Sequence, residues 1–348
     1  MRATERRPAH RPLLLFLVGP TASGKSDVAV ELAARIGGEI VSADSMQVYR
    51  GLDIISAKPS AGQRSRVPHH LLDIAGPRER FDAARYALLA KAAIGTVLAR
   101  GRVPIVAGGA GMYVRSIADG LFAGVGRDAA LRGRLERAAD AGGRAALHAR
   151  LAAVDPEAAS RIHPNDRRRI VRALEVFELS GRTISSLRRE WMPDAERPEP
   201  GAPWFSRNLG AECVFIGMRR GAPDLSRRIE ERARGMLAAG ALGEARRILE
   251  ICGETRGTIW QSLGLRELLG VIEGRSTPDE AAEAIAAATR AYAKRQRTWF
   301  NRDPRVLWFD VPPDETPAAT AGRICSHVGG AAPVLVHRGG ADGGAGEG

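Results

Sequence analysis

Short apolar runs alternate along the chain with longer stretches in which apolar residues recur every three or four positions. The apolar runs predict buried strands, and they are Leu13–Val18, Glu39–Ala43, Val103–Ala107, Val214–Met218 and Val306–Asp310. The longer stretches predict helices between the first strands, over Asp27–Ile36 and Phe81–Arg100. Because strands that alternate with helices form βαβ units, the pattern predicts an α/β fold with a parallel sheet.

The middle of the chain has a different pattern. From about Asp128 to Trp191 it is charged and helical in period, with no stretch that predicts a strand. We therefore expect an α/β core formed by residues 13–127 and 200–330, interrupted by an all-helical insertion at 128–199. We expect the chain ends, residues 1–12 and 331–348, to be disordered; the second of them is rich in glycine and lacks either periodicity.

One late helix has a distinct start. Thr277 fits the N-cap, Pro278 the first helical position and Glu280 the third residue of a capping box. The apolar residues that follow predict one buried face, formed by Ala281, Ile285, Ala288, Tyr292 and Trp299. The basic residues of another face are Arg290, Lys294 and Arg297.

Charge and cysteine content narrow the function classes. The 348 residues include 52 Lys and Arg against 40 Asp and Glu, a formal net charge of +12. This surplus favours a polyanionic partner such as nucleic acid, although a soluble arginine-rich surface explains it equally well. Cys213, Cys252 and Cys325 lie far apart without a CxxC spacing, so neither a disulfide framework nor a zinc finger is indicated. The first apolar run is too short for a secretory signal, so we expect a cytoplasmic protein without a membrane partner.

The stretch GPTASGKS lies between the first predicted strand and the first predicted helix. Its spacing, Gly19-x4-Gly24-Lys25-Ser26, is that of a phosphate-binding loop. In such a loop backbone N–H groups face the anion, the lysine neutralises phosphate oxygens, and the serine ligates Mg²⁺. The expected phosphate-binding residues are Gly19, Pro20, Thr21, Ala22, Ser23, Gly24, Lys25 and Ser26. The loop by itself does not distinguish ATP and other nucleotides from other pyrophosphates.

Asp44 follows the second predicted strand, at the carboxyl end where open α/β sheets bind ligands. A carboxylate at this place acts as a general base, as a magnesium ligand or simply as the cap of the next helix. A nucleotide hydrolase normally has an aspartate at the end of another strand to hold magnesium, whereas the run VPIVAGGAG ends in glycines. This difference weakens the ATPase interpretation.

Six stretches of the chain, in order, resemble the bacterial tRNA dimethylallyltransferases, also called isopentenyltransferases. They are GPTASGKS, DSMQVYRGLDI, AKPS, PHHLLDI, HPNDRRRIVRALEVFELSG and AYAKRQRTWF, and the similarity extends over about Leu13 to Asp310. The resemblance implies a P-loop NTPase-like core and a magnesium-dependent transferase that modifies tRNA. Such enzymes move the dimethylallyl group of dimethylallyl diphosphate to the exocyclic amine, N6, of the adenosine 3′ of the anticodon in certain tRNAs, releasing diphosphate.

The resemblance also implies roles for single residues. The phosphate loop would hold the diphosphate leaving group, Lys25 would neutralise its charge, and Asp44 would take a proton from the amine. The helical insertion would clamp the tRNA anticodon stem-loop, and the target base would leave its stack. The residues that match the family's tRNA-contact segments are Asp44, Ser45, Met46, Gln47, Ala110, Arg132, Arg168, Arg169, Ile170, Val171, Arg172, Gln261, Ser262, Leu263, Gly264, Leu265, Arg266, Glu267 and Leu268.

Several positions depart from the family's usual pattern. Ala110 stands where a threonine is usual, so a hydroxyl that would assist diphosphate binding or orient the base is absent. Leu265 stands where a tyrosine is usual, which removes a stacking ring. The stretch ISAKPS replaces GTAKPS. The adjacent His69 and His70 would point to opposite sides of a strand, so we expect them to be structural and not metal ligands.

Three other functions remain compatible with these residues. A P-loop small-molecule kinase would leave the basic clusters RRRIVR and AKRQR unexplained, unless they are a solvated basic face. An adenylate prenyltransferase would use a free nucleotide as acceptor and would not need extensive basic helices. A non-catalytic RNA-binding relative of the enzymes would account for Ala110. In each case we expect a monomer.

Overall fold

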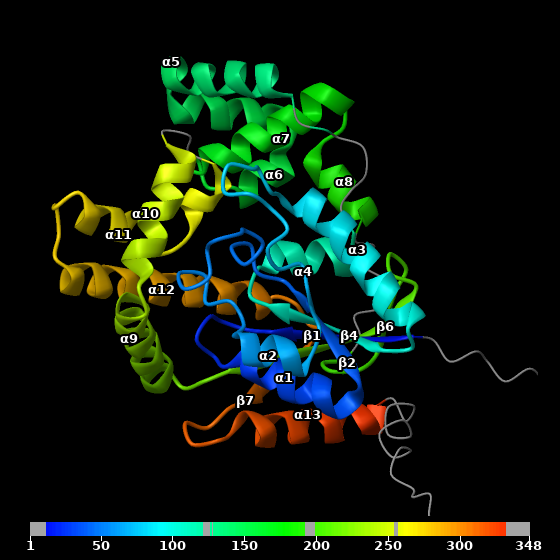
Figure 1. Cartoon of the computed structure of the whole chain (residues 1–348). Coiled ribbons are helices and arrows are strands. Elements are labelled where there is room, and N and C mark those ends of the chain that lie inside the picture. The colour runs from blue at the N-terminus through cyan, green and yellow to red at the C-terminus, as the bar shows by residue number, and fades with distance from the viewer. Residues whose placement is uncertain (1–11, 121–125, 127, 192–198, 254–256, 332–348) are drawn as a thin grey trace, which may run out of the picture. The chain divides into compact units, whose positions relative to one another are not determined.

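The computed structural model describes residues 12–120, 126, 128–191, 199–253 and 257–331, and the chain forms two compact units (Figure 1). The first unit comprises 1–118 and 197–348, and the second comprises 119–196. Most of the two chain ends that we expect to be disordered, residues 1–11 and 332–348, lies outside the described residues. Ala331 was included in that expectation, but it is the last residue of a helix.

A seven-stranded sheet forms the centre of the described part of the first unit. Its strands are β1 Leu13–Val18, β2 Gly38–Ser42, β3 His69–His70, β4 Val103–Gly108, β5 Trp204–Ser206, β6 Ala211–Arg219 and β7 Val306–Asp310. The spatial order is β3-β2-β4-β1-β6-β5, with β7 also paired to β6, and the pairs are parallel except for β5 with β6. The predicted α/β fold with a parallel sheet is confirmed. The strands that were not predicted, β3 and β5, are too short to produce a periodic signal.

Helices cover both faces of this sheet (Figure 1). They are α1 Lys25–Ile36, α2 Ala61–Arg66, α3 Ala83–Ala99, α4 Gly111–Ala118, α9 Ala222–Ala238, α10 Ala241–Cys252, α11 Leu265–Ile272, α12 Pro278–Phe300 and α13 Pro317–Ala331. Successive residues of a strand point to opposite faces. Leu15 and Leu17 accordingly pack in a core with α1 and α13, whereas Leu14 and Phe16 belong to a second core with α3, α4 and α9 to α12.

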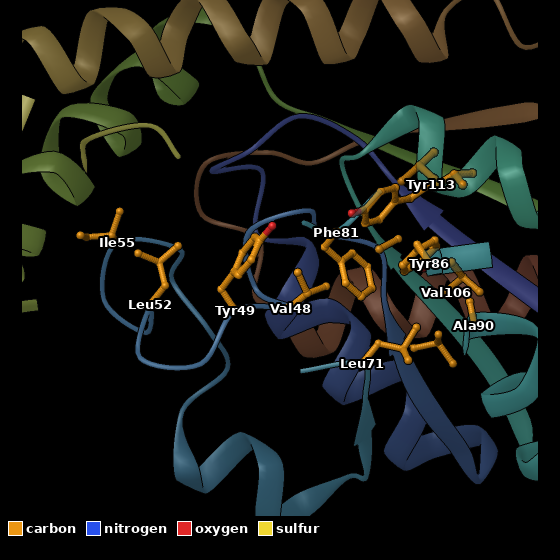
Figure 2. Packing of buried hydrophobic residues seen from close by; sticks show 14 of the residues in the cluster. Val48, Tyr49, Leu52, Ile55, Leu71, Phe81, Tyr86, Ala90, Val106 and Tyr113 are labelled. Atoms are coloured by element: carbon orange, nitrogen blue, oxygen red, sulfur yellow. The ribbon is translucent and has the colours of Figure 1, made fainter. Parts of the chain in front are cut away.

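The second core is rich in stacked aromatic rings. Phe16 stacks on Phe215 of the neighbouring strand, with ring centroids 4.3 Å apart. Tyr86 of α3 stacks on Tyr113 of α4 at 3.9 Å, and Figure 2 shows these two rings beside Phe81. Tyr49, to the left of these rings in Figure 2, belongs to the same core and lies in the segment that follows β2. This core therefore packs α3 and α4 against the segment on which Asp44 lies.

Helix α12 begins as the sequence predicts. The N–H of Glu280 donates to Thr277 Oγ1 at 3.2 Å, and the N–H of Thr277 donates to the Glu280 carboxylate at 2.8 Å. The predicted buried face is wrong at its far end, since Trp299 is 36% exposed. The helix turns about 100° per residue, which places Ala293 and Phe300 on the buried side instead.

The described part of the second unit consists mainly of helices. The helices are α5 Ala129–Val154, α6 Pro156–Arg161, α7 Arg167–Ser180 and α8 Ile184–Trp191. Gly143 has a φ of 77° and interrupts α5, so that α5 consists of two helices across a kink. Leu135 and Leu151 of these two halves pack on Leu174 of α7. In neither unit does a helix of the described residues have the length and hydropathy to cross a bilayer.

Gly108 is the last residue of β4, and its backbone lies close to that of Ala43, which follows β2. A Cβ at Gly108 would lie 2.2 Å from the Ala43 carbonyl oxygen. We predict that Gly108→Ala lowers the free energy of unfolding by about 2 kcal/mol or more, because relief of this overlap disrupts the pairing of β2 and β4. Chemical denaturation measures the loss.

Gly95 of α3 is the matched control for this substitution. A Cβ at Gly95 has no neighbour within 4 Å, and the residue is exposed. Gly95→Ala should therefore raise the free energy of unfolding by about 1 kcal/mol through helix propensity alone. Equal stability of the two variants would contradict the close approach at Gly108.

Candidate active site

Three loops meet at the carboxyl edge of the parallel strands. Val18 pairs with Gly108, and Ser42 pairs with Ala107, so the chain leaves β1, β2 and β4 at the same level of the sheet. The N–H of Ala110 donates to the Ala43 carbonyl at 3.1 Å, which ties the loop after β4 to the loop after β2. The phosphate loop, Asp44 and Ala110 are therefore brought together, as expected for ligand sites of open α/β sheets.

The stretch from Gly19 to Ser26 has the geometry of a phosphate-binding loop. Ala22 and Gly24 have left-handed φ values of 62° and 90°, and α1 begins directly after Gly24. Gly19 has a φ of 146°, and a Cβ there would lie 2.4 Å from the Met218 carbonyl oxygen, so only glycine fits. The loop directs the N-terminus of α1 at the space beside it, which favours an anion.

Lys25 is half-buried in this loop beside other charges. Its ammonium donates to the Pro20 carbonyl at 2.7 Å. Burial lowers the pKa of Lys25 from an ordinary 10.5 to about 8; the Asp44 carboxylate acts against this shift, and Arg232 adds to it. Because a buried cation without a counter-ion is unfavourable, the site gains from an anion that replaces the lost water.

Three arginines contact successive residues of the loop from outside it. Arg232 donates to Thr21 Oγ1 at 3.1 Å, Arg228 to the Ala22 carbonyl at 3.0 Å, and Arg220 to the Ser23 carbonyl at 2.9 Å. Arg228 and Arg232 lie on α9, and Arg220 lies just before it. None of these three arginines was predicted from the sequence to lie at the site. Their only signal was the spacing of four residues between Arg228 and Arg232, which places both on one face of a helix.

A cavity of about 530 Å³ opens over the loop. Its basic lining residues are Lys25, Lys58, Arg228 and Arg232, and its acidic ones are Asp27, Asp44 and Glu231. The Lys58 ammonium is already paired with Asp53 at 2.6 Å and Asp73 at 2.5 Å, and its side chain is almost wholly buried. The cations directed at an anion in this cavity are therefore Lys25, Arg228 and Arg232.

A second cavity of about 230 Å³ adjoins the first, and Thr21, Asp44, Ser56 and Arg232 line both. Its apolar lining residues are Met46, Ile55, Ile229, Ala233, Met236, Leu263 and Ile285. Its other lining residues are polar, and they include Thr289, Tyr292 and Arg295. Asp44 thus lines both a cationic cavity and a cavity that combines an apolar wall with polar groups.

Asp44 is half-buried, and one of its carboxylate oxygens has a backbone partner. Oδ1 accepts from the N–H of Met46 at 2.8 Å, which fixes the side chain in a local turn. Burial raises the pKa of Tyr292 to about 12, and the negative charge of Asp44 adds to this shift. Burial likewise raises the pKa of Tyr113, again with a contribution from Asp44. The carboxylate therefore acts through space on the hydroxyl groups of both tyrosines, of which Tyr292 lines the smaller cavity.

The segment that follows Asp44 is held in place by buried polar side chains. Gln47 accepts from Ser42 Oγ at 2.9 Å and donates to the Ala57 carbonyl at 3.1 Å. The Glu244 carboxylate accepts from three successive N–H groups, those of Asp53, Ile54 and Ile55, at 2.8 to 2.9 Å. Figure 2 shows Val48, Tyr49, Leu52 and Ile55 of this segment among the core side chains. Gln47 therefore has a structural role in this chain, although its sequence position matches a tRNA contact.

The segment from Gln261 to Leu268 divides into exposed and buried side chains. Gln261 and Arg266 are exposed, and Leu263 lines the smaller cavity. Leu265 and Leu268 belong to the hydrophobic core of the first unit, and Ser262 is buried as well. Burial is not compatible with tRNA contact for the Leu265 and Leu268 side chains, whereas Ser262 lines the smaller cavity and its contact with tRNA stays a prediction. Gly264 has a left-handed φ of 97° and is the N-cap of α11. Its N–H donates to the Glu267 carboxylate at 3.1 Å.

The basic cluster of the second unit is only partly exposed. Ile170 and Val171 lie in the core of this unit, at 0% and 3% exposure, so their expected contact with tRNA is also wrong for the side chains. Arg168 and Arg169 of α7 are exposed, and Arg169 forms an ion pair with Asp166 on its own helix.

Arg132 and Arg172 have a different environment. Both donate to the wholly buried Glu175 carboxylate, at 2.7 and 2.8 Å. Burial acts to raise the pKa of Glu175, but the hydrogen bonds from Arg172 and Arg132 outweigh it and lower the pKa. The two arginines therefore compensate a buried charge, a role that the sequence alone did not indicate.

Oxygen ligands suited to magnesium are present in the larger cavity. Ser26 and Asp44 both line it, and Mg²⁺ is usually bound by one or two protein oxygens together with substrate phosphates. Among the described residues, no three His, Cys, Asp or Glu side chains form a metal-binding group. His69 and His70 are structural as expected: His70 pairs with Glu39 at 2.7 Å, and His69 Nδ1 lies 2.8 Å from the Val67 carbonyl oxygen.

Comparison with known proteins gives a consistent result. The chain matches the family described as IPP transferase over residues 47–303, and the family described as Isopentenyl transferase over residues 13–77. It is 46% identical over 299 residues to the tRNA dimethylallyltransferase of Geobacter metallireducens, covering 86% of this chain and 93% of that protein. It is 48% identical over 301 residues to the tRNA dimethylallyltransferase of an Anaeromyxobacter species, covering 86% and 95%.

Solved structures agree with these relatives. The full-length tRNA isopentenylpyrophosphate transferase from Bacillus halodurans is similar with a TM-score of 0.65 and 35% identity, over 93% of this chain and 98% of that one. A eukaryotic dimethylallyltransferase acting on tRNA is similar with a TM-score of 0.71 and 26% identity, over 86% and 74%.

Lys25 should make anion binding dependent on pH. Its pKa of about 8 in the empty site rises when an anion binds, so binding takes up a proton above pH 8. We predict that the affinity for inorganic pyrophosphate, divided by that of Lys25→Met at the same pH so that the titration of pyrophosphate cancels, is constant below pH 8 and falls by up to about tenfold per pH unit above it. Titration calorimetry measures the profile. Lys25→Met should bind weakly at pH 7 and lack the step at pH 8.

The same pKa shift affects the stability of the empty protein. Because the pKa of Lys25 is lower in the folded than in the unfolded state, its burial as a cation costs stability below pH 8 and not above pH 10.5. Without phosphate, Lys25→Met should therefore have a higher Tm than the parent at pH 7. A lower Tm at pH 7 would show that Lys25 is not held at an electrostatic cost.

Proposed function

The chain belongs to the IPP transferase family, and we propose that it transfers the dimethylallyl group of dimethylallyl diphosphate to tRNA. It is an enzyme that catalyses prenyl transfer to tRNA. The proposed acceptor atom is the exocyclic amine, N6, of the adenosine 3′ of the anticodon. The observation that supports this proposal most directly is that Asp44 lines both a cationic cavity and a cavity with a wall of apolar side chains.

The two cavities match the two parts of the proposed donor. Dimethylallyl diphosphate joins a five-carbon apolar group to a diphosphate with several negative charges. Lys25, Arg228 and Arg232 suit the diphosphate, whereas the side chains around Met46 and Ile285 suit the hydrocarbon. Burial of an apolar group of this size contributes about 0.8 kcal/mol per CH₂, so the smaller cavity adds affinity and orients the reacting carbon.

The proposed reaction forms one bond and breaks another. The N6 nitrogen bonds to the first carbon of the dimethylallyl group while the bond from that carbon to the diphosphate oxygen breaks. The electron pair leaves with the diphosphate, where Lys25, Arg232 and the loop N–H groups stabilise the added charge. The proton lost by N6 goes to the Asp44 carboxylate, which lies at the boundary of both cavities.

Magnesium suits this chemistry and this chain. The Ser26 hydroxyl would hold the ion together with diphosphate oxygens, and the ion would neutralise part of the leaving-group charge. Ser26 follows directly on Lys25 at the start of α1, and both residues line the larger cavity.

Exposed basic residues support tRNA as the acceptor. Arg168 and Arg169 on α7 of the second unit are exposed, as is Arg266 of the first unit. Phosphate contacts from such side chains supply most of the salt-dependent affinity for nucleic acids. A free nucleotide would need none of these groups, and neither would the substrate of a small-molecule kinase.

The residues around β4 also argue against a kinase. The strand ends in Gly108, Gly109 and Ala110, none of which can ligate the magnesium of a nucleoside triphosphate. Ala110 lacks the hydroxyl usual at its position, but Asp44 and the loop cations are all present. We therefore favour a catalytic prenyltransferase over a non-catalytic relative.

Asp44→Asn tests the proposed base. The amide keeps the shape of the side chain but accepts no proton, so we predict a rate of single-turnover dimethylallyl transfer to tRNA roughly 10²–10⁴-fold below the parent. Affinity for dimethylallyl diphosphate should not fall, because the charge removed is negative like that of the diphosphate. Rapid-quench measurements with labelled donor separate the chemical step from product release.

Glu231→Gln is the matched control for Asp44→Asn. Glu231 lines the same cavity but is exposed and paired with Arg227 of its own helix. Loss of this charge should leave the single-turnover rate within about threefold of the parent. If Asp44→Asn is as fast as Glu231→Gln, Asp44 is not the base.

Arg168→Ala combined with Arg169→Ala tests the tRNA surface. Each lost phosphate contact should reduce the slope of log affinity against log salt concentration by about one, so the double variant should lose about two. Filter binding over a salt series measures the slope. Arg172→Ala should instead lower the Tm, because it removes a partner of the buried Glu175. An unchanged slope in the double variant would assign Arg168 and Arg169 to a merely solvated face.

A further inference from the structure

Gln296 connects two of the loops that form the active site. It lies on α12 and is 6% exposed. Its Oε1 accepts from the backbone N–H of Thr21 at 2.8 Å, and its Nε2 donates to the Gly109 carbonyl at 2.9 Å. Thr21 belongs to the phosphate loop, and Gly109 belongs to the turn after β4. One side-chain amide therefore sets the spacing between the phosphate loop and the turn after β4.

The fit around this amide is close. A Cβ at Gly109 would lie 2.0 Å from Gln296 Nε2 and 3.1 Å from the Gly19 carbonyl oxygen. The amide thus occupies space that only glycine leaves open. Its orientation is also determined, because a flipped amide would place Nε2 against the Thr21 N–H and Oε1 against the Gly109 carbonyl.

The bridge has consequences for the donor loop. Thr21 is held from two sides, since its N–H binds Gln296 while its hydroxyl accepts from Arg232 at 3.1 Å. The Thr21 N–H is directed at Gln296, so the N–H groups left for a phosphate are those later in the loop. Thr21 also lines both cavities, so any shift of it alters the site for the diphosphate and the site for the hydrocarbon.

We propose that Gln296 is a positioning residue that holds the phosphate loop in its diphosphate-binding shape through Thr21 and Gly109. This inference rests on the proposed function of the loop. Gln296 does not need to contact the diphosphate itself, because the oxygen and the nitrogen of its side-chain amide are already bonded to the two loops. A neutral amide serves this place well, since a carboxylate would repel the diphosphate and a cation would add to the charge of Lys25.

Gln296→Leu removes both hydrogen bonds and keeps a similar volume. We expect its affinity for inorganic pyrophosphate, measured by titration calorimetry, to be roughly tenfold below the parent, the effect of two lost hydrogen bonds. In steady-state kinetics the KM for dimethylallyl diphosphate should rise, whereas the KM for tRNA should stay unchanged. Thr298→Val is the matched control. Thr298 is exposed on the same helix and bonds only the Lys294 carbonyl, so this variant should bind pyrophosphate like the parent.

Gln296→Glu provides a test that a loss of folding cannot imitate. A protonated carboxyl group can accept from Thr21 and donate to Gly109 as the amide does, whereas an ionised one cannot donate. The affinity of Gln296→Glu for pyrophosphate, divided by that of the parent at each pH between 5 and 8, should therefore rise towards one as the pH falls. The same ratio for Gln296→Leu should stay low at all pH values, since leucine has no proton to gain.

The outcomes separate the two proposals. If the parent does not bind pyrophosphate, the proposed function of the loop is wrong. If the parent binds and Gln296→Leu binds equally well, the loop has its function but Gln296 does not position it. If Gln296→Leu does not fold, an affinity ratio for Gln296→Glu that stays low at pH 5 would overturn the proposal by itself.

Discussion

The structure around the active site depends on one electrostatic constraint, which is that several cations lie together in a partly desolvated site. Lys25 and Arg232 are both half-buried, and the loss of hydration lowers the pKa of each. Bare cations in a low dielectric repel one another and lose their hydration. The Asp44 carboxylate reduces this cost, since it acts against the pKa shift of both residues. The base of the proposed reaction is therefore also the counter-ion of the empty site.

Other contacts hold the arginines in place at the phosphate loop. Arg228 and Arg220 donate to backbone carbonyls of the phosphate loop, and Arg220 also pairs with the buried Asp224. These bonds direct the loop carbonyls outward, which leaves the later N–H groups free to face a ligand. Such a loop needs little rearrangement when the donor binds, and preorganised charge of this kind is the main source of catalysis in group transfer.

The same principle recurs in places far from the phosphate loop. Glu244 is buried beneath the segment after Asp44 and accepts from three successive backbone N–H groups. Glu175 is buried in the second unit and binds both Arg132 and Arg172. In each case a buried carboxylate has all its partners supplied by the chain, which makes it tolerable and fixes the surrounding geometry. The residues thus oriented include Ile55 of the smaller cavity and Arg132 and Arg172, which the sequence analysis expects to contact RNA.

Local chemistry was enough to predict much of this protein from its sequence. The parallel sheet, the phosphate loop before α1, Asp44 at a strand end and the capping box at Thr277 all follow from periodicity or from bonds between residues a few positions apart. The family resemblance rests on the same short stretches. Their geometry depends on few neighbours, so the pattern of side chains determines it.

Only the tertiary structure decided which polar groups form hydrogen bonds with one another. Gln296 bonds Thr21 across 275 residues, Arg232 bonds Thr21 across 211, and Glu244 bonds Asp53 across 191. The sequence placed Ile170, Val171, Leu265 and Leu268 in RNA-contacting stretches, and the fold buries all four. A stretch that matches a binding segment does not state which of its side chains face inward, because that depends on the helices packed against it. Partners so distant along the chain leave no periodic signal, and their pairing is set by the packing of the sheet and helices as a whole.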